Sequence, residues 1–361
     1  MRQAGGDPSI LWPRDGDRTS GLSYVPCKTA PRLGLGGCAR AARRGKPWGM
    51  NARWQQASIL GGLILALIWL RWLWPQSPLL ALAAVAALLL MPAWSITLQF
   101  LYMRAAPRDA ALPAVGTRAL LRAWWVEVVL AYRIFGWRQP FRHRVVADTD
   151  TDCRGATGVV LVHGYLCNRG FWQPWQRFLA ARGIPCIAVT LEPVWGSIDD
   201  CAPGLDEAVR RMQQATGRPP VLIGHSMGGL VIRAWLRSRG AMVCEGRSEA
   251  EAAQRLQELV AHVITIGTPH QGTAMADISR TTNGRQMRQR SDWLLALARH
   301  EPQALAARMT CWYSNCDNLV FPASAATYPG ADNRLVLDQA HVEMVFDPGL
   351  MQDCAALVAK A

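Results

Sequence analysis

Two long apolar runs stand out in the first third of the chain. Residues 57–70 carry no charge, Arg71 follows them, and residues 78–103 form a 26-residue stretch without a charge. A transmembrane helix needs about 20 consecutive apolar residues. The second run is therefore long enough to cross a bilayer, and the first is long enough if Arg71 reaches toward an interface rich in tryptophan. Because only the short stretch PQSP separates them, we predict a membrane hairpin with helices at about 57–74 and 78–103.

Basic residues on both sides of this hairpin predict its orientation. Such residues favour the cytoplasmic side of a membrane. We therefore expect both ends of the hairpin, and the rest of the chain, in the cytoplasm at a bacterial inner membrane. If only one run crosses, the rest of the chain faces the periplasm, and a cleaved signal peptide remains an alternative for the first run. The flanking basic residues are Arg43, Arg44, Lys46 and Arg53 before the hairpin, and Arg104, Arg108, Arg118 and Arg122 after it.

The segments on either side of the hairpin differ in their periodicity. Residues 1–49 are rich in Arg, Gly and Pro without a sustained period, which predicts disorder. Met50 opens a short basic lead into the first apolar run, so we expect it to be the natural start. Residues 105–140 have helical spacing with few charges around 120–137, and predict an amphipathic linker helix that packs on the following domain or lies on the membrane.

From residue 141 the pattern changes to short apolar runs that alternate with helical stretches. Short apolar strands separated by helices are typical of a mostly parallel, doubly wound α/β sheet with helices on both faces. We therefore predict one catalytic domain over 141–361, with an arginine-rich cap at about 273–303. The expected strands are 143–148, 158–164, 184–191, 219–226, 262–269, 309–315 and 333–339, and the expected helices are 171–183, 202–217 and 227–240.

The charge of the chain is concentrated in its first part. Residues 1–150 carry 19 Lys and Arg against 7 Asp and Glu, whereas residues 151–361 carry 20 against 19, so +12 of the net +13 lies before residue 151. These basic residues flank apolar runs and form no basic face interleaved with aromatic residues. This pattern favours anchoring at a membrane over binding of nucleic acid.

The cysteines and glycines point to no cofactor. Ten cysteines are scattered without a C-x-x-C pair, so we expect free thiols in a reducing compartment and no zinc site, with a disulfide open if the domain is exported. The GLGG at 34–37 follows no predicted strand, which argues against a dinucleotide loop. We expect neither a cofactor nor a metal.

The stretch VLIGHSMGGLVIRAWL at 221–236 carries the first candidate for chemistry. Its serine, Ser226, lies between a predicted strand and a predicted helix, with Gly224 and His225 before it and Gly228 two residues after it. A sharp strand–turn–helix of this kind exposes a serine at the carboxyl edge of the sheet, and we expect the two glycines to relieve a mutual clash. The simpler alternative is a tight turn with an incidental serine.

A nucleophilic serine needs a base and an acid that orients the base. Asp317 and His341 each follow a predicted strand downstream of Ser226, at the carboxyl ends where such sheets place their sites. Asp317 as a loop cap and His341 as a packed loop residue are the simpler alternatives. The less suitable acids are Asp277, Asp292 and Asp338; the less suitable histidines are His262 and His300. We expect His270, in GTPHQGT, to line the pocket.

Backbone N–H groups are needed for the oxyanion. The stretch LVHGYLCN ends a predicted strand at His163 and Gly164, and the glycine lets the chain turn so that the Tyr165 N–H points into the site. The Met227 N–H, at the start of the helix, is the second expected donor.

Taken together, HGYL, GHSMGG, GTPHQGT, the aspartate of SNCDNLVFP and the histidine of AHVEM resemble the α/β-hydrolase superfamily, in particular its bacterial lipases and esterases. The resemblance covers about residues 141–361. It implies an ester hydrolase with Ser226 as nucleophile, His341 as base, Asp317 as orienting acid, and the Tyr165 and Met227 amides as oxyanion hole. The hairpin departs from secreted lipases.

We therefore expect a membrane-anchored carboxylic ester hydrolase whose partners are a membrane and a lipid or acyl-ester substrate. An acyltransferase of the same fold, in which an alcohol or amine replaces water, is one alternative. A non-catalytic membrane scaffold is another. The sequence does not indicate the acyl chain length or the oligomeric state.

Overall fold

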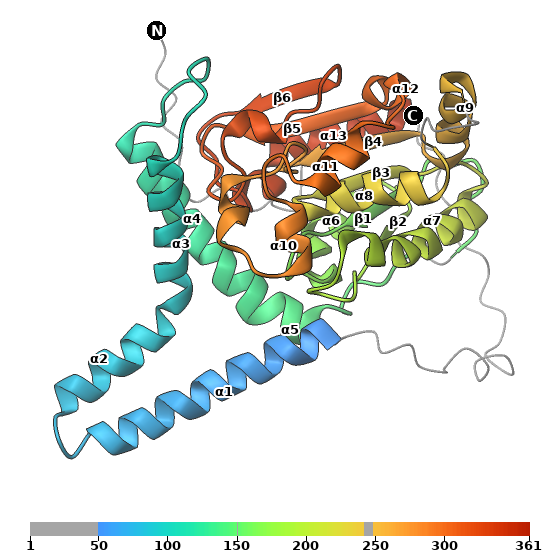
Figure 1. The fold of residues 1–361 in the computed structure, drawn as a ribbon. Helices are drawn as coiled ribbons and strands as arrows, with labels where there is room; N and C mark the ends of the chain where they lie inside the picture. The colour runs from blue at the N-terminus through green and yellow to red at the C-terminus, as the bar shows by residue number, and fades with distance from the viewer. Residues whose placement is uncertain (1–49, 150, 242–247) are drawn as a thin grey trace, which may run out of the picture.

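The computed structural model describes residues 50–149, 151–241 and 248–361. The expectations for residues 1–49 lie outside the described residues. From Met50 onward the chain forms a group of helices followed by a sheet that helices cover on both faces (Figure 1).

One six-stranded sheet organises the second part of the chain. Its order is β2-β1-β3-β4-β5-β6, and every neighbouring pair is parallel. The predicted mostly parallel α/β sheet is thus confirmed. The strands are β1 (Val159–Val162), β2 (Cys186–Ala188), β3 (Val221–His225), β4 (His262–Ile266), β5 (Met309–Ser314) and β6 (Asp332–Val336).

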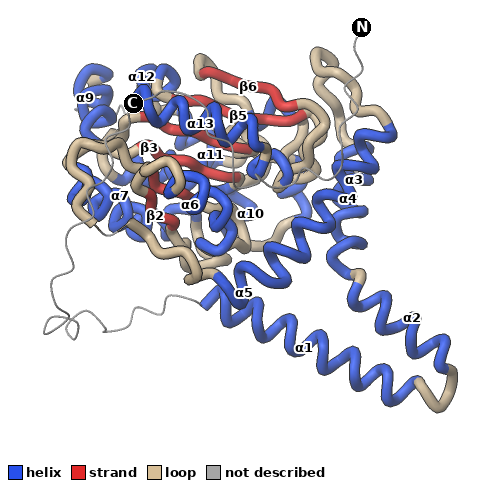
Figure 2. The backbone as a smooth tube through the Cα atoms, turned by 180° about the vertical axis from the view of Figure 1, so that it is seen from behind, coloured by secondary structure: helices blue, strands red, loops and turns tan. Residues whose placement is uncertain are grey.

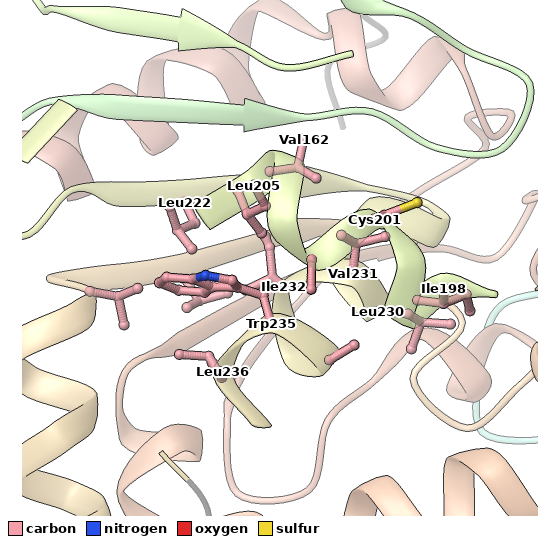
Figure 3. Close-up of a cluster of buried hydrophobic side chains, with 14 of the residues drawn as sticks. Val162, Ile198, Cys201, Leu205, Leu222, Leu230, Val231, Ile232, Trp235 and Leu236 are labelled. Atoms are coloured by element: carbon pink, nitrogen blue, oxygen red, sulfur yellow. The ribbon is translucent and has the colours of Figure 1, made fainter. Parts of the chain in front are cut away.

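Alternate residues of the strands belong to two separate hydrophobic cores. Val160 and Leu222 point to the face covered by α7 (Ala202–Thr216) and α8 (Met227–Ser238), where Trp235 is buried (Figure 3). Their neighbours Val159 and Leu161 point to the opposite face, covered by α6 (Gln173–Ala180) and α13 (Pro348–Lys360) (Figure 2). Burial on both faces explains why the strands read as continuous apolar runs.

Shorter helices make up the connections and the region predicted as a cap. The α-helices are α9 (Glu249–Leu259), α10 (Thr282–Gln286), α11 (Asp292–Ala298) and α12 (Gln303–Ala307). The 3-10 turns are η2 (Arg169–Trp172), η3 (Ile198–Cys201), η4 (Ala274–Ile278), η5 (Ala323–Ala326) and η6 (Glu343–Phe346).

The strand expected at 143–148 is not formed. This segment runs beside β2, but side chains make several of the bonds that a strand would make with its backbone. Asp148 Oδ1 accepts from the Ala188 N–H at 3.0 Å, and Thr149 Oγ1 accepts from the Cys186 N–H at 3.0 Å. A side chain that binds the edge of the sheet in this way replaces the regular ladder.

The N-terminal helices are α1 (Met50–Leu73), α2 (Pro78–Leu89), α3 (Met91–Ala105), α4 (Thr117–Arg133) and α5 (Gln139–Arg142), with a π-helical turn η1 (Ile134–Arg138) between the last two. Helices α1 and α2 project away from the sheet (Figure 1). Helix α4 packs against the domain through Leu130, and η1 does so through Ile134, as expected for the linker. The linker is not one helix over 105–140, because residues 106–116 form a loop.

The second apolar run is a broken helix, where one continuous helix was expected. Helices α2 and α3 meet at Leu90 with a bend of 59°. Pro92, the second residue of α3, explains the break, since proline has no N–H to donate and its ring clashes with the carbonyl four residues earlier. Among the helices of the described residues, only α1 is by itself long and apolar enough to cross a membrane, with a mean hydropathy of 1.6 over 18 residues, and the bent pair passes the same test together.

The cysteines of the described residues agree with the expected free thiols. Cys167, Cys186, Cys201, Cys311, Cys316 and Cys354 are free thiols, and all seven described cysteines are buried. Burial raises the pKa of most of these thiols, to about 12 at Cys186 for example, so they are inert packing residues at neutral pH.

Candidate active site

Ser226 lies in a strained turn at the carboxyl end of β3. Its backbone has φ 54° and ψ −130°, and it directly precedes α8. Its N–H donates to Ile266 O at the end of β4 at 2.9 Å. A non-glycine residue with positive φ persists only where its surroundings enforce it, and such residues concentrate at functional sites.

The glycines around Ser226 allow close backbone approach, but not in the way that the sequence suggested. A Cβ on Gly224 would lie 2.7 Å from the Gly229 N, and one on Gly228 would lie 2.2 Å from Val162 O in β1. The two glycines therefore do not relieve a clash with each other. Gly224 makes room for the first turn of α8, and Gly228 makes room for the neighbouring strand.

His341 and Asp317 form a buried pair. His341 Nδ1 lies 2.9 Å from both Asp317 carboxylate oxygens, and the two side chains are each 2 % exposed. The Leu319 and Val320 N–H groups donate to Asp317 Oδ1 at 2.8 Å. The carboxylate is thus fixed, and it holds the proton of the imidazole on Nδ1.

Gly267, at the end of β4, lets this pair come together. It has φ +58°, and a Cβ there would lie 3.1 Å from His341 Nδ1 and 3.2 Å from Asp317 Oδ2. Only glycine adopts such a conformation without strain while leaving this space free.

The charges around His341 favour its protonated form. Burial lowers the pKa of His341, but the charge and hydrogen bond of Asp317 and the charge of Glu127 outweigh this and leave the pKa raised above 6.5. An imidazole whose cationic form is stabilised in this way suits a base that takes up a proton during a reaction.

The residue directly before Ser226 contacts His341. The His225 ring lies 4.6 Å from the His341 ring and stacks on Phe171 at 4.8 Å. Among the described residues, Ser226 Oγ forms no hydrogen bond with His341. Catalytic hydrogen bonds are often long in the absence of substrate and tighten only when it binds.

The loop after β1 lies directly against Ser226. A Cβ on Gly164 would be 2.8 Å from Ser226 Cβ and 3.3 Å from its Oγ. Within the described part of the chain the Tyr165 N–H donates to no other group. The Met227 N–H is the first donor of α8, where helical N–H groups lack partners inside the helix. Two free donors thus flank the serine.

His163 holds this loop in place. Its Nδ1 lies 2.8 Å from Gly164 O, and its Nε2 accepts from the Leu191 N–H at 3.0 Å. Burial lowers the pKa of His163 to about 4. His163 is therefore a neutral structural histidine whose two nitrogens fix the turn that carries Gly164 and Tyr165.

His270 lies among buried residues beside Arg233. It is buried, its Nε2 is 2.9 Å from Thr265 Oγ1, and its carbonyl accepts from Arg233 Nη1 at 2.9 Å. Its ring packs edge-on against Tyr328. These contacts pack His270 around Arg233, and its role in lining the pocket stays a prediction.

The rival acids and histidines occupy other places. Asp277, Asp292 and His300 are exposed. His262 Nε2 bonds Thr310 Oγ1 at 2.9 Å beside the opposite end of β4. Asp338 is half-buried, with Oδ1 3.5 Å from Asn315 Nδ2. None of these makes a hydrogen bond to His341 within the described residues.

Two residues near the pair escaped sequence reasoning. Asn318 Oδ1 accepts from the His341 N–H at 3.1 Å, and the Glu127 carboxylate accepts from the next N–H, that of Val342, at 3.1 Å. The signal for Glu127 was a lone acid on the buried face of a helix, since Ala123 and Leu130 share that face. Asn318 gives no comparable signal, because asparagine is common in loops.

No metal site accompanies these residues. Over residues 50–149, 151–241 and 248–361 no group of three or more His, Cys, Asp or Glu side chains is placed to hold a metal ion.

Comparison with known families identifies the family of the chain. A model described as "Alpha/beta hydrolase family" matches residues 159–356, which is more than half of the chain. The chain belongs to the alpha/beta hydrolase family. The parallel sheet with helices on both faces is the α/β-hydrolase fold, as the sequence predicted. A search of curated proteins finds no match.

Several solved hydrolase structures are similar to this chain at low identity. The mature lipase BlEst2 from Bacillus licheniformis is 16 % identical, with 59 % of this chain and 96 % of that chain covered and a TM-score of 0.46. Lipase B from Aspergillus fumigatus is 15 % identical, with coverages of 55 % and 51 % and a TM-score of 0.44. The phospholipase PlaB from Legionella pneumophila is 17 % identical, with coverages of 44 % and 40 % and a TM-score of 0.33.

Proposed function

We propose that this chain is a membrane-anchored serine hydrolase that cleaves carboxylic esters of lipids or acyl compounds. The observation that carries the proposal is the strained Ser226 at the end of β3, in the same site as the buried Asp317–His341 pair. Membership of the hydrolase family supports hydrolytic activity, and these residues supply the parts that ester cleavage needs.

In the proposed reaction, Ser226 Oγ attacks the ester carbonyl and His341 Nε2 takes up its proton. Asp317 holds the Nδ1–H of His341 and stabilises the imidazolium that forms. The Tyr165 and Met227 N–H groups donate to the oxyanion. The C–O bond to the alcohol then breaks, and His341 gives the alcohol its proton. Water, deprotonated by His341, attacks the acyl-enzyme and releases the acid and Ser226.

Exposed apolar side chains support the anchoring part of the proposal. Only 6 % of the most apolar window of α1 is buried, so α1 is not a core helix. On α1, Leu67 is 65 % and Trp72 is 66 % exposed, and on α2 Leu79 is 79 % exposed. Surfaces of this kind are stable when lipid covers them.

The two ends of the hairpin support a single side for the catalytic domain. Near the start of α1, Asn51 Nδ2 donates to Cys167 O at 2.5 Å, and near the end of α3, Tyr102 Oη donates to Ala274 O at 3.2 Å. Both ends of the hairpin thus contact the domain, while the α1–α2 turn is remote from it (Figure 1). We propose that α1 and α2 enter the bilayer from the side on which the domain lies, the cytoplasmic side of a bacterial inner membrane.

Hydrolysis of p-nitrophenyl esters from C2 to C16 by the detergent-solubilised chain tests the activity. The Ser226→Ala variant removes the proposed nucleophile, and Ser238→Ala at the exposed far end of α8 is the matched control. We expect the parent and Ser238→Ala to be active and Ser226→Ala to fall to background. The chain-length optimum then separates an esterase from a lipase.

Background rates in all three folded proteins would contradict ester hydrolysis. In that case, a fluorophosphonate label on Ser226 would indicate a reactive serine and favour acyl transfer to another acceptor. The absence of a label would favour a non-catalytic scaffold.

A further inference from the structure

The helices before the catalytic domain contact three of the loops that carry the proposed site. Helix α1 contacts the loop after β1, where Gln55 Nε2 donates to Leu166 O at 3.0 Å. Helix α3 contacts the loop after β5, where Asn318 Nδ2 donates to Gln99 Oε1 at 2.7 Å. Helix α4 contacts the loop of His341 through Glu127. The N-terminal segment is therefore part of the architecture of the site as well as an anchor.

The contact made by Glu127 is the most specific of the three. Its Oε1 and Oε2 accept from the Val342 N–H at 3.1 and 3.2 Å, and Oε2 also accepts from the Glu343 N–H at 3.2 Å. These are the two residues that follow His341, and Glu343 begins the turn η6. Glu127 is 4 % exposed. A buried carboxylate is costly unless hydrogen bonds and charges compensate it, so its place here needs a cause.

A carboxylate in this position can act on His341 in two ways. It binds consecutive N–H groups directly after His341, and charge-assisted bonds of this kind are stronger than neutral ones, so they fix the backbone that carries the imidazole. Its negative charge also lies close enough to favour the imidazolium form, and is one of the causes that raise the pKa of His341.

We infer that Glu127 is a positioning residue for His341, and that it links the anchor-side helix α4 to the proposed catalytic base. The inference rests on the proposed function. Gln99 and Asn318 form a second link between the N-terminal helices and His341, because Asn318 bonds both Gln99 of α3 and the His341 N–H.

The charged groups near Glu127 and its burial together set the pKa of Glu127. Burial raises the pKa of Glu127 to about 7; the charge of His341 and the Val342 N–H lower it, and the charge of Asp317 raises it. On the solvent side, Arg122 of the same helix pairs with Glu343. The charge of His341 and the Val342 N–H thus stabilise the charged carboxylate against the effect of burial.

Steady-state kinetics on a short, water-soluble ester test this inference without involving the membrane. Glu127→Gln keeps the shape but removes the charge and places an NH₂ group against an N–H donor. We expect kcat/KM to fall about 10- to 100-fold, mostly in kcat, because small displacements of a catalytic group have effects of this size. We also expect the acid limb of the pH profile to move to lower pH, since His341 loses a neighbouring negative charge. Glu258→Gln, at an exposed acid of α9, is the control that keeps the parent profile.

Two results would overturn the inference. One is a Glu127→Gln variant with the same kcat/KM as the parent protein. The other is a variant whose kcat/KM falls equally at all pH values and whose acid limb does not move, as a merely structural role would give. If Glu127→Gln fails to fold, Glu127→Asp replaces it, because it keeps the charge but shortens the reach to the N–H groups. For Glu127→Asp we then expect the same acid limb as in the parent protein but a lower kcat. A kcat equal to that of the parent would contradict the positioning role. Ser226→Ala separates the two proposals, because an active Ser226→Ala would refute the proposed function itself.

Discussion

Ser226 has a backbone conformation that costs about 1–3 kcal/mol, and its neighbours enforce it. The hydrogen bond from its N–H to Ile266 O and the close fit of Gly224 against Gly229 leave the turn no alternative. The strained conformation of Ser226 therefore depends on the single residues around it. We expect substitutions of these residues to have large effects on stability.

Gly228→Ala tests this close fit. The added Cβ would lie 2.2 Å from Val162 O and 2.8 Å from His163 O, which are both backbone atoms that cannot yield easily. We expect a loss of about 1–3 kcal/mol or more in the free energy of unfolding. Gly204→Ala, in α7 with nothing within 4 Å of its Cβ, is the control. It should stabilise the protein by up to about 1 kcal/mol. Equal thermal unfolding of the two variants in detergent would contradict the proposed fit.

Asp317→Asn tests the orientation of His341. An amide in place of the carboxylate can no longer hold the proton on His341 Nδ1 or stabilise the imidazolium, so we expect kcat to fall by about 10⁴-fold at neutral pH. The parent should lose kcat/KM as the pH falls through a pKa above 6.5, because protonation of His341 removes the base. Ester hydrolysis between pH 5 and 9 measures both effects. An Asp317→Asn variant with the activity of the parent would exclude Asp317 as the orienting acid.

At the scale of elements, apolar periodicity predicted those parts of the fold that local sequence determines. The strands around Val160, Leu222 and Ile264 were predicted because burial on both faces makes them uniformly apolar. The segment 143–148 was wrongly predicted as a strand, because its apolar residues resemble one. In the structure, Arg169 donates to Val146 O of this segment, and the Asp148 side chain accepts from the Ala188 N–H of β2.

The residues of the proposed triad could be predicted because each of them follows a strand. The residues that contact the loops carrying the triad could not be predicted. Glu127, Gln99 and Gln55 come from helices that are more than 100 residues away in sequence from the loops they bind. Such contacts follow from the docking of helices, which periodicity does not determine. The contact of His270 with Arg233 could not be predicted either, because Arg233 lies on a helix that packs against His270 only in the folded protein.

The buried ion pair between Arg233 of α8 and Glu301 gives a prediction at the scale of elements. Arg233 Nε lies 2.6 Å from Glu301 Oε1, both side chains are under 5 % exposed, and Tyr328 Oη donates to Glu301 at 2.9 Å. Removing one partner leaves a buried charge, so Arg233→Met should destabilise the protein by about 3–5 kcal/mol. Thermal or denaturant unfolding measures this loss.

Two further variants separate the buried charge from a loss of packing. Arg255→Met, at an exposed pair with Glu258, should cost about 0–1 kcal/mol. The double variant Arg233→Met, Glu301→Leu should recover much of the loss, because no buried charge remains. A double variant as unstable as Arg233→Met would show that packing, and not the uncompensated charge, causes the effect.

At the scale of the whole molecule, the apolar helices and the catalytic domain form one arrangement. Both ends of the α1–α3 segment contact the domain, helices α1 and α2 project away from it (Figure 2), and apolar side chains on these two helices are exposed. With the proposed anchoring, the site would lie close to a membrane surface, where esters dissolved in the bilayer are concentrated.

Reporter fusions at the C-terminus test the orientation. With the domain on the cytoplasmic side, a C-terminal green fluorescent protein should fluoresce in bacterial membranes, and a C-terminal alkaline phosphatase should be inactive. The two reporters respond oppositely and control for each other. An active phosphatase together with a dark fluorescent protein would place the domain in the periplasm, as expected if only one apolar run crosses.

The central claim is that Ser226 is the nucleophile, and covalent labelling tests it most directly. The full chain in detergent is treated with a fluorophosphonate, digested with trypsin and analysed by mass spectrometry. We predict a single adduct on Ser226, lost in Ser226→Ala and in heat-denatured protein, and retained in Ser238→Ala. A parent protein that hydrolyses esters but carries no adduct on Ser226, or carries it on another residue, would contradict the account.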